Sequence, residues 1–283
     1  MKDRILDTVR KIEGLRDGHF HYDRLVKTAE YIEGEFALCG LKVERDVFLF
    51  QGRSYWNIIA FPPGMAPDSE AVLIGAHYDA VMGSPGADDN ASGVAVMLEA
   101  ARRLGPRRGL QYTAFTLEEP QAESANFLIG SKHFVKRMKS LGKRYNTVFI
   151  LESVGYISHE PGSQLLPAMV KGPEVGDFIG LVGNKRAKNI MVRFQEAALT
   201  QVPKLKVVTH TALLKGFLII ETRFSDHAPF WDAGYPAVMI TDTAMFRNSN
   251  YHSGSDTADT LSPDFMAQVA EALVHTVGGF LEP

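Results

Sequence analysis

The sequence predicts an α/β fold with a mixed, mostly parallel central sheet and helices on both faces. Four short apolar runs, at residues 71–76, 112–117, 147–151 and 237–241, indicate buried strands, because strands covered on both faces are apolar without alternation. Segments with helical spacing separate these runs. With 283 residues, 45% hydrophobic and 22% charged, the chain can bury a large core. We therefore expect one sheet sandwiched between layers of helices.

The elements follow in order along the chain. Apolar residues at helical spacing predict helices over 3–14 and 22–39, and Gly40 is a typical C-terminal stop. Two strand-like runs come next, at 42–50 and 56–61. Further helices are expected at 91–104, 131–141, 185–199 and 263–280. The stretches 158–176 and 203–221 are expected to be loops or edge strands around the site.

Composition excludes several classes of function. No linker or charge block divides the chain, so we expect a single domain over 1–283. A net charge of −3 gives no electrostatic footprint for nucleic acid. Residues 1–15 lack the apolar core of a signal peptide, and no stretch approaches the roughly 18 apolar residues of a membrane span. We expect a cytoplasmic protein that does not bind membranes, while the sequence specifies no oligomeric state.

A histidine and carboxylates follow the predicted strands. The first apolar run ends in a Gly-rich stretch, 75–93, that contains His77, Asp79, Asp88 and Asp89. The second run precedes the Glu118-Glu119 doublet, the third ends at Glu152, and the fourth precedes a loop with His252. In open α/β sheets the chemistry lies beyond the carboxyl ends of the strands. Gathering these side chains there is costly unless a cation collects them.

The donor set itself indicates zinc. Histidine and carboxylate without thiolate suit zinc in hydrolytic sites, with manganese or cobalt as substitutes. Five ligand positions exceed the three that one catalytic zinc takes, whereas two metals about 3.5 to 4 Å apart, sharing a carboxylate and a water, would use all five. One glutamate of the doublet would then bind metal. The other would take a proton from the water as general base.

Six motifs resemble those of a known family. They are GAHYD, PGADDNASG, LEE, ILES, SDHAPF and YHSGSDT, and they run from residue 75 to residue 260. In this order they resemble the co-catalytic di-zinc aminopeptidases, which include bacterial leucyl aminopeptidases, aminopeptidase Y and glutamate carboxypeptidase II. The resemblance covers the catalytic domain and leaves about the first 50 residues unassigned. It implies a zinc-exopeptidase fold and a peptide substrate.

The resemblance also implies a role for each matching residue. His77 and Glu152 would hold one zinc, Glu119 and His252 the other, and Asp89 would bridge the two. The position of Glu152 is more often aspartate in the family, so its longer arm is a departure that would shift that metal.

Four further carboxylates have expected roles beside the ligands. Glu118 would be the general base that activates a water shared by the two zinc ions. Asp79 would hydrogen-bond His77 and fix its tautomer, which suits the His-x-Asp spacing. Asp256 would do the same for His252, and Asp88 is expected to support the loop.

Substrate contacts are expected from two segments. In the SDHAPF motif, His227 either helps to hold the tetrahedral intermediate or is a core histidine, and Asp226 is equally ambiguous. Arg223 either receives a peptide carboxylate or forms a structural ion pair.

A second group lies nearer the predicted metal site. Tyr251, with Met245 and Phe246, is expected to line a pocket for a large apolar N-terminal residue. Glu123 is expected to be solvated, with an anchor for the substrate N-terminus as the alternative.

Four functions remain open at this stage. The first is an exopeptidase that removes N-terminal residues, and a carboxypeptidase-type member of the same family is the second. The third is a single-zinc glutaminyl cyclase of related fold, which Trp56 and Trp231 disfavour because they lie away from the tryptophan positions of cyclases. The fourth is a non-catalytic relative of the transferrin-receptor kind, which the complete ligand set disfavours.

Overall fold

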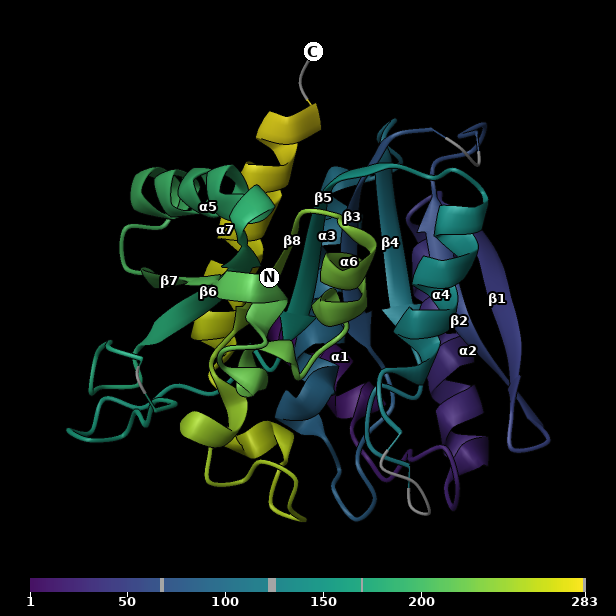
Figure 1. Ribbon diagram of the computed structural model, residues 1–283. Helices are drawn as coiled ribbons and strands as arrows, with labels where there is room; N and C mark the ends of the chain where they lie inside the picture. The colour runs from purple at the N-terminus through teal and green to yellow at the C-terminus, as the bar shows by residue number, and fades with distance from the viewer. Residues whose placement is uncertain (67–68, 122–125, 169, 282–283) are drawn as a thin grey trace.

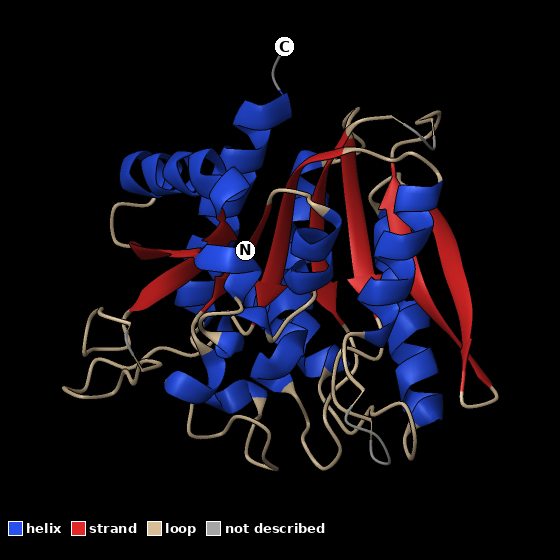
Figure 2. Ribbon diagram, viewed as in Figure 1, coloured by secondary structure: helices blue, strands red, loops and turns tan. Residues whose placement is uncertain are grey.

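The computed structural model describes residues 1–66, 69–121, 126–168 and 170–281. Its centre is an eight-stranded mixed sheet, whose strands are red in Figure 2. The strands are β1 (Lys42–Phe50), β2 (Arg53–Phe61), β3 (Ala71–His77), β4 (Leu110–Phe115), β5 (Tyr145–Glu152), β6 (Phe178–Asn184), β7 (Lys206–Ala212) and β8 (Ala237–Thr241). Their order across the sheet is β1-β2-β4-β3-β5-β8-β6-β7. The predicted α/β class is confirmed.

The central strands are parallel and set the position of the site. β3 pairs with β4 and β5, and β5 pairs with β8, all in parallel. β1, β2 and β6 join their inner neighbours antiparallel, and β7 runs parallel to β6 at one outer edge. The carboxyl ends of β3, β4, β5 and β8 therefore meet at one edge of the sheet, the lower edge in Figure 1.

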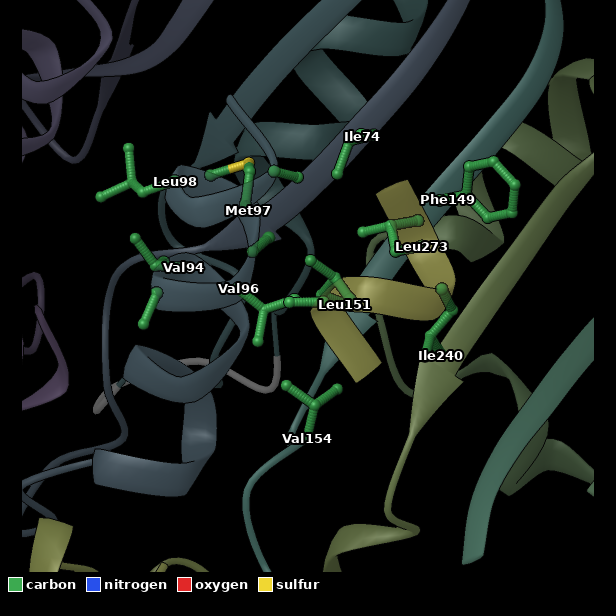
Figure 3. Close-up of a cluster of buried hydrophobic side chains, with 14 of the residues drawn as sticks. Ile74, Val94, Val96, Met97, Leu98, Phe149, Leu151, Val154, Ile240 and Leu273 are labelled. Carbon is green, nitrogen blue, oxygen red and sulfur yellow. The ribbon is translucent and has the colours of Figure 1, made fainter. Parts of the chain in front are cut away.

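Helices cover both faces of the sheet. They are α1 (Lys2–Ile12), α2 (Tyr22–Leu38), α3 (Gly93–Leu104), α4 (Ile129–Ser140), α5 (Lys188–Gln201), α6 (His227–Ala233) and α7 (Pro263–Leu281). The helices α1, α2, α3, α5 and α7 pack against one another on one face, whereas α4 and α6 pack together on the other, in front in Figure 1. Each face buries a separate apolar cluster, and Figure 3 shows the larger one, in which Val94 and Leu98 of α3 lie with Ile74 and Leu273.

The strand β3 shows why the local sequence folds in this way. All seven residues of Ala-Val-Leu-Ile-Gly-Ala-His are buried, as expected for a strand with helices on both sides. Gly75 allows the close packing, because a Cβ there would lie 2.7 Å from Phe115 and 2.9 Å from Ile150. The close packing of the strand therefore fixes the position of His77 at the edge of the sheet.

Some elements differ from the sequence-based expectations. β4 lies two residues earlier than the predicted run at 112–117, so the glutamate doublet follows the strand through a short loop. β6 was not predicted, and α6 was not recognised as a helix within its motif. β7 is one of the edge strands expected within 203–221. Within the described residues, no helix combines the length and the apolar character that a membrane span requires.

Candidate metal centre and active site

Five side chains converge at the carboxyl edge of the sheet. His77 ends β3, Glu152 ends β5, and Glu119 follows β4 in a loop. Asp89 lies in the turn Ala87–Ser92, just before α3, where its own backbone is not helical, and His252 lies in the loop after β8. His77, Asp89 and Glu119 are at most 3% exposed. The structure thus brings together the five residues that the sequence singled out as metal ligands.

The five side chains form two halves around Asp89. In the first half, His77 Nε2 lies 3.1 Å from Asp89 Oδ1 and 3.4 Å from Glu152 Oε2. In the second half, His252 Nε2 lies 3.1 Å from Asp89 Oδ2 and 3.2 Å from Glu119 Oε2. Glu118 Oε2 is also near the first half, 3.9 Å from His77 Nε2, but farther than Glu152. Each carboxylate oxygen of Asp89 therefore faces a different imidazole.

The donor atoms fit metal ions better than they fit one another. Among the described residues, His77 Nε2, Asp89 Oδ1 and Glu119 Oε1 are buried and lack a hydrogen bond of suitable geometry. Such buried polar atoms are costly unless something else satisfies them. Two sets of ligand atoms, His77 with Glu118 and Glu152, and His77 with Asp89 and Glu119, each lie within 4.8 Å of one another. Nitrogen and carboxylate donors at this density suit zinc.

Burial shapes the ionisation of this cluster. Burial and the nearby Asp89 carboxylate raise the pKa of Glu119 to about 8. Burial likewise raises the pKa of Glu118 well above its ordinary value, with a further contribution from Glu152. For His252, burial lowers the pKa, but hydrogen bonds to Asp89 and Glu119 outweigh it and raise the pKa to about 10. Without a cation the cluster therefore retains protons at neutral pH, and metal binding would displace them.

Asp79 links two of the loops. Its carboxylate accepts the backbone N–H groups of Glu118 and Glu119, each at 3.2 Å. Its Oδ1 lies 3.5 Å from His77 Nδ1, the atom expected to hydrogen-bond it, but this nitrogen makes no hydrogen bond of suitable geometry with the described residues. Asp79 thus fixes the backbone of the glutamate doublet next to the imidazole.

The expectation for Asp256 is wrong. Its carboxylate accepts the backbone N–H groups of Asp88 at 2.9 Å and Asp89 at 3.2 Å, and no described hydrogen bond joins it to His252. The backbone path of the loop directs Asp256 towards the turn that carries Asp89. Besides its contacts with Asp89 and Glu119, the His252 ring stacks on Tyr251, with 3.8 Å between the ring centroids.

The turn at Asp89 is held by buried hydrogen bonds. Asp88 supports the loop, as expected, because it accepts the backbone N–H of Gly155 and the Nδ2 group of Asn248. The peptide bond between Asp89 and Asn90 is cis, and Asn90 Nδ2 donates to the Leu151 carbonyl at 2.8 Å. The turn that carries Asp89 is therefore tied to β5.

The residues expected to contact substrate have different surroundings. Arg223 forms an ion pair with Asp232 at 2.8 Å, so the structural alternative holds for this guanidinium. His227 is fully buried, and its Nε2 donates to the Thr222 carbonyl at 2.7 Å. Burial lowers the pKa of His227 to about 4, so the ring is neutral at pH 7. Burial raises the pKa of Asp226 to about 7.

Two adjoining cavities open at the cluster of five candidate metal ligands. One is bordered by Asp89, Glu118, Glu119, Phe127, Glu152 and His252. The other, with a volume of about 130 Å³, has mostly apolar walls that include Phe178, Val208, Met239 and Phe246. Phe224, Met245 and Tyr251 border both cavities. Met245, Phe246 and Tyr251 thus line a pocket, as expected, whereas Glu123 lies outside the described residues.

Two contacts were missed by the sequence reasoning. Ser225 Oγ donates to Glu152 Oε2 at 2.7 Å and so orients that carboxylate. Its place in the SDHAPF motif was an available signal. Arg16 contacts the loop after β3, and nothing in the sequence pattern indicated this.

A family model decides the classification. The model of peptidase family M28 matches residues 57–277, which is most of the chain and includes every side chain of the cluster. The chain belongs to peptidase family M28. Membership confirms the predicted hydrolase class and the predicted family of the zinc-aminopeptidase type.

Curated proteins resemble this M28 chain over most of its length. Uncharacterized protein YfbL from Escherichia coli strain K12 is 38% identical over 267 residues, which are 89% of this chain and 79% of YfbL. A probable leucine aminopeptidase from Arthroderma otae is 31% identical over 251 residues, which are 83% of this chain. The match covers 58% of that fungal protein, so this chain spans little more than half of its length.

Solved structures share the M28 fold. The LapA aminopeptidase of Legionella pneumophila has a TM-score of 0.76 at 18% identity, covering all of this chain and 72% of LapA. BSAP, a zinc aminopeptidase from Bacillus subtilis, has 0.59 at 26% identity, covering 82% and 52%. A glutaminyl cyclase from Macrostomum lignano has 0.76 at 19% identity, covering 100% and 91%. Aminopeptidases and cyclases thus share this fold, and only the site can distinguish them.

Proposed function

We propose that this M28 chain is an aminopeptidase that removes N-terminal residues from peptides and uses two zinc ions bound in its active site. The observation that carries the proposal is the position of Asp89, whose two oxygens face His77 and His252 separately. One metal would need only one half of this arrangement. Manganese or cobalt would be substitutes, since the same nitrogen and oxygen donors accept them.

The ligands divide between the two ions. His77 and Glu152 would hold one ion, His252 and Glu119 the other, and Asp89 both. When bound, the ions would lower the pKa of a shared water and polarise the scissile carbonyl. Ser225 supports this arrangement, because its hydroxyl donates to Glu152 Oε2 and so orients the carboxylate.

Glu118 is the proposed general base. Its carboxyl group is buried beside the proposed ligands and borders the cavity at the cluster, so it is placed to accept a proton from a water there. In the proposed reaction, Glu118 takes the proton of the attacking water and returns it to the leaving amine. Hydrogen bonds from Glu118 and Glu119 N–H groups to Asp79 keep this carboxyl group in place.

The apolar cavity is the proposed pocket for the N-terminal side chain. It adjoins the cluster at Glu152 and Tyr251, and its walls carry Phe178, Val208 and Met239. A wall of this kind favours a large apolar side chain over a charged one. The probable leucine aminopeptidase among the relatives agrees with this preference.

Glu118→Gln tests the proposal. We expect leucyl-p-nitroanilide hydrolysis to fall by about 10²- to 10⁴-fold, while zinc content is unchanged because the base is not a ligand. N-acetylated leucyl-p-nitroanilide is the control substrate, and it should not be cleaved by the wild-type enzyme. A variant that keeps full activity would refute the role of Glu118.

The shared fold makes cyclisation the competing function. Glutaminyl peptides should therefore be assayed with the same preparation for both release of glutamine and formation of pyroglutamate. Pyroglutamate without hydrolysis of any aminoacyl-p-nitroanilide would assign the chain to the cyclases.

A further inference from the structure

The segment between α1 and α2 passes behind the loops that carry the proposed metal ligands. We name residues 13–18 the N-terminal strap; in Figure 1 the purple trace between the two helices follows the lower edge of the molecule. Arg16, in the middle of the strap, is fully buried. Its guanidinium donates to the carbonyls of Tyr78 and Gly86, each at 2.8 Å, and to those of Gly14 and Pro85. In the described part of the chain, none of its hydrogen bonds goes to a carboxylate.

A buried guanidinium without a paired carboxylate needs an explanation. Burial lowers the pKa of Arg16 to about 10, against the opposing charges of Asp79, Asp256 and Asp89. The side chain therefore remains charged at neutral pH. Its desolvation is offset by three carbonyls of the loop that separates His77 from Asp89 and by the carbonyl of Gly14, so most of its hydrogen bonds fix that loop.

The loop itself is shaped around this guanidinium. Gly86 has a φ of +59°, and a Cβ there would lie 2.4 Å from the Asp89 carbonyl oxygen and 3.0 Å from Arg16 Nη2. Glycine is therefore required where the loop approaches both groups. Asp89 lies only three residues after Gly86, so any movement of this turn also moves the proposed bridging carboxylate.

The strap also contacts the other two loops of the centre. Glu13 accepts the backbone N–H of Ala258 at 2.8 Å, beyond His252. Gly18 abuts the loop of the glutamate doublet, since a Cβ there would lie 2.3 Å from Leu117 and 2.9 Å from Gln121. One short segment therefore contacts all three loops that carry proposed ligands after β3, β4 and β8.

We propose that Arg16 is a positioning residue for the metal centre, which it serves by gripping the backbone of residues 78–86 from behind. The inference rests on the proposed two-metal function. The family match begins at residue 57, so it assigns no role to the strap. Arg16 acts through the loop and contacts neither metal nor substrate.

Two variants separate the geometry of Arg16 from its charge. Arg16→Lys keeps the charge but loses the planar, multidentate donor, and Arg16→Met loses both. If the grip matters, both variants should bind zinc about 10- to 100-fold more weakly, as changes behind metal ligands do. If only the charge matters, Arg16→Met should bind zinc more tightly, because a positive charge near the cations is removed, and Arg16→Lys should equal the wild type.

Arg24→Met is the matched control. Arg24 also donates to carbonyls of the N-terminal segment, those of Lys11 at 2.8 Å and Glu13 at 3.0 Å, but none of its hydrogen bonds among the described residues reaches a loop that carries proposed ligands. Zinc affinity and stoichiometry would be measured on full chains by competition with a chromophoric chelator. The visible absorption spectrum of the cobalt-loaded proteins would report ligand geometry independently of activity.

We expect weaker zinc binding and an altered cobalt spectrum in both Arg16 variants, and neither change in Arg24→Met. Zinc affinity and a cobalt spectrum equal to those of the wild type in Arg16→Lys would overturn the positioning role. An Arg16→Lys protein that stays unfolded in excess zinc would overturn it too. A wild-type chain that binds no zinc would instead refute the proposed function itself.

Discussion

At the scale of single residues, the site depends on which groups are charged when buried. His227 is the clearest case outside the proposed ligands. It is neutral in the fold, with a pKa lowered to about 4 by burial, whereas an unfolded histidine has a pKa near 6.5. Between these values the unfolded chain binds more protons, so this histidine makes stability fall as pH falls. Above pH 6.5 this histidine is neutral in both states, so it no longer lowers the free energy of unfolding.

His227→Gln should remove this part of the pH dependence. Glutamine keeps an N–H donor for the Thr222 carbonyl and does not titrate. Relative to the wild type, the variant should gain roughly 3 kcal/mol in unfolding free energy between pH 7 and pH 4, by urea denaturation of metal-free protein. An unchanged difference between the two proteins across this range would contradict a buried neutral histidine.

The sequence could predict the proposed ligands but not all their partners. His77 and Glu152 end apolar strands, so the geometry of a parallel sheet brings them together. The partner of Asp256 depends on the three-dimensional path of its loop, which a four-residue spacing does not determine. Arg16 binds backbone carbonyls, which leave no pattern in the side-chain sequence.

At the scale of elements, the packing of β3 should control the site from a distance. Its glycine is enclosed by Phe115 and Ile150, so an added methyl group would have to displace neighbouring side chains. By contrast, Gly34 in α2 has no neighbour within 4 Å of an added Cβ. The two glycines therefore form a natural pair for comparison.

Gly75→Ala should lower the unfolding free energy by about 1–3 kcal/mol, because the core around β3 is already full. Gly34→Ala should raise it by about 0.5–1 kcal/mol, since alanine is the better residue inside a helix. Urea denaturation of both variants in metal-free form measures the difference. Equal effects of the two changes would mean that Gly75 is not closely packed.

Elements were predictable where the local sequence carries a clear signal. The helices α2 and α7 repeat apolar residues at helical spacing, and the strands β3 and β5 contain continuous apolar runs. The short strand β6 contains two glycines among seven residues, which weakens its pattern, and only pairing with β7 and β8 stabilises it as a strand. Long-range pairing of this kind cannot be read from a local window.

At the scale of the whole molecule, metal binding should be linked to protons. In the metal-free chain Glu119 and His252 have pKa values of about 8 and about 10, so both hold protons at pH 7. Zinc must displace these protons, so zinc affinity should rise with pH. Unperturbed ligands would make this rise end near pH 6.5.

We expect zinc affinity to rise by at least about tenfold between pH 7 and pH 8, one factor of ten for each proton released. Competition with a chelator, corrected for the chelator's own protonation, measures it at each pH. An affinity that is constant above pH 7 would contradict the raised pKa values.

The most direct test of the two-metal account is the zinc content of the full chain purified without chelator. Elemental analysis should give two zinc ions per chain, and Asp89→Ala should reduce this number because each half loses one of its carboxylate oxygens. A wild-type chain that saturates at one zinc would contradict the account.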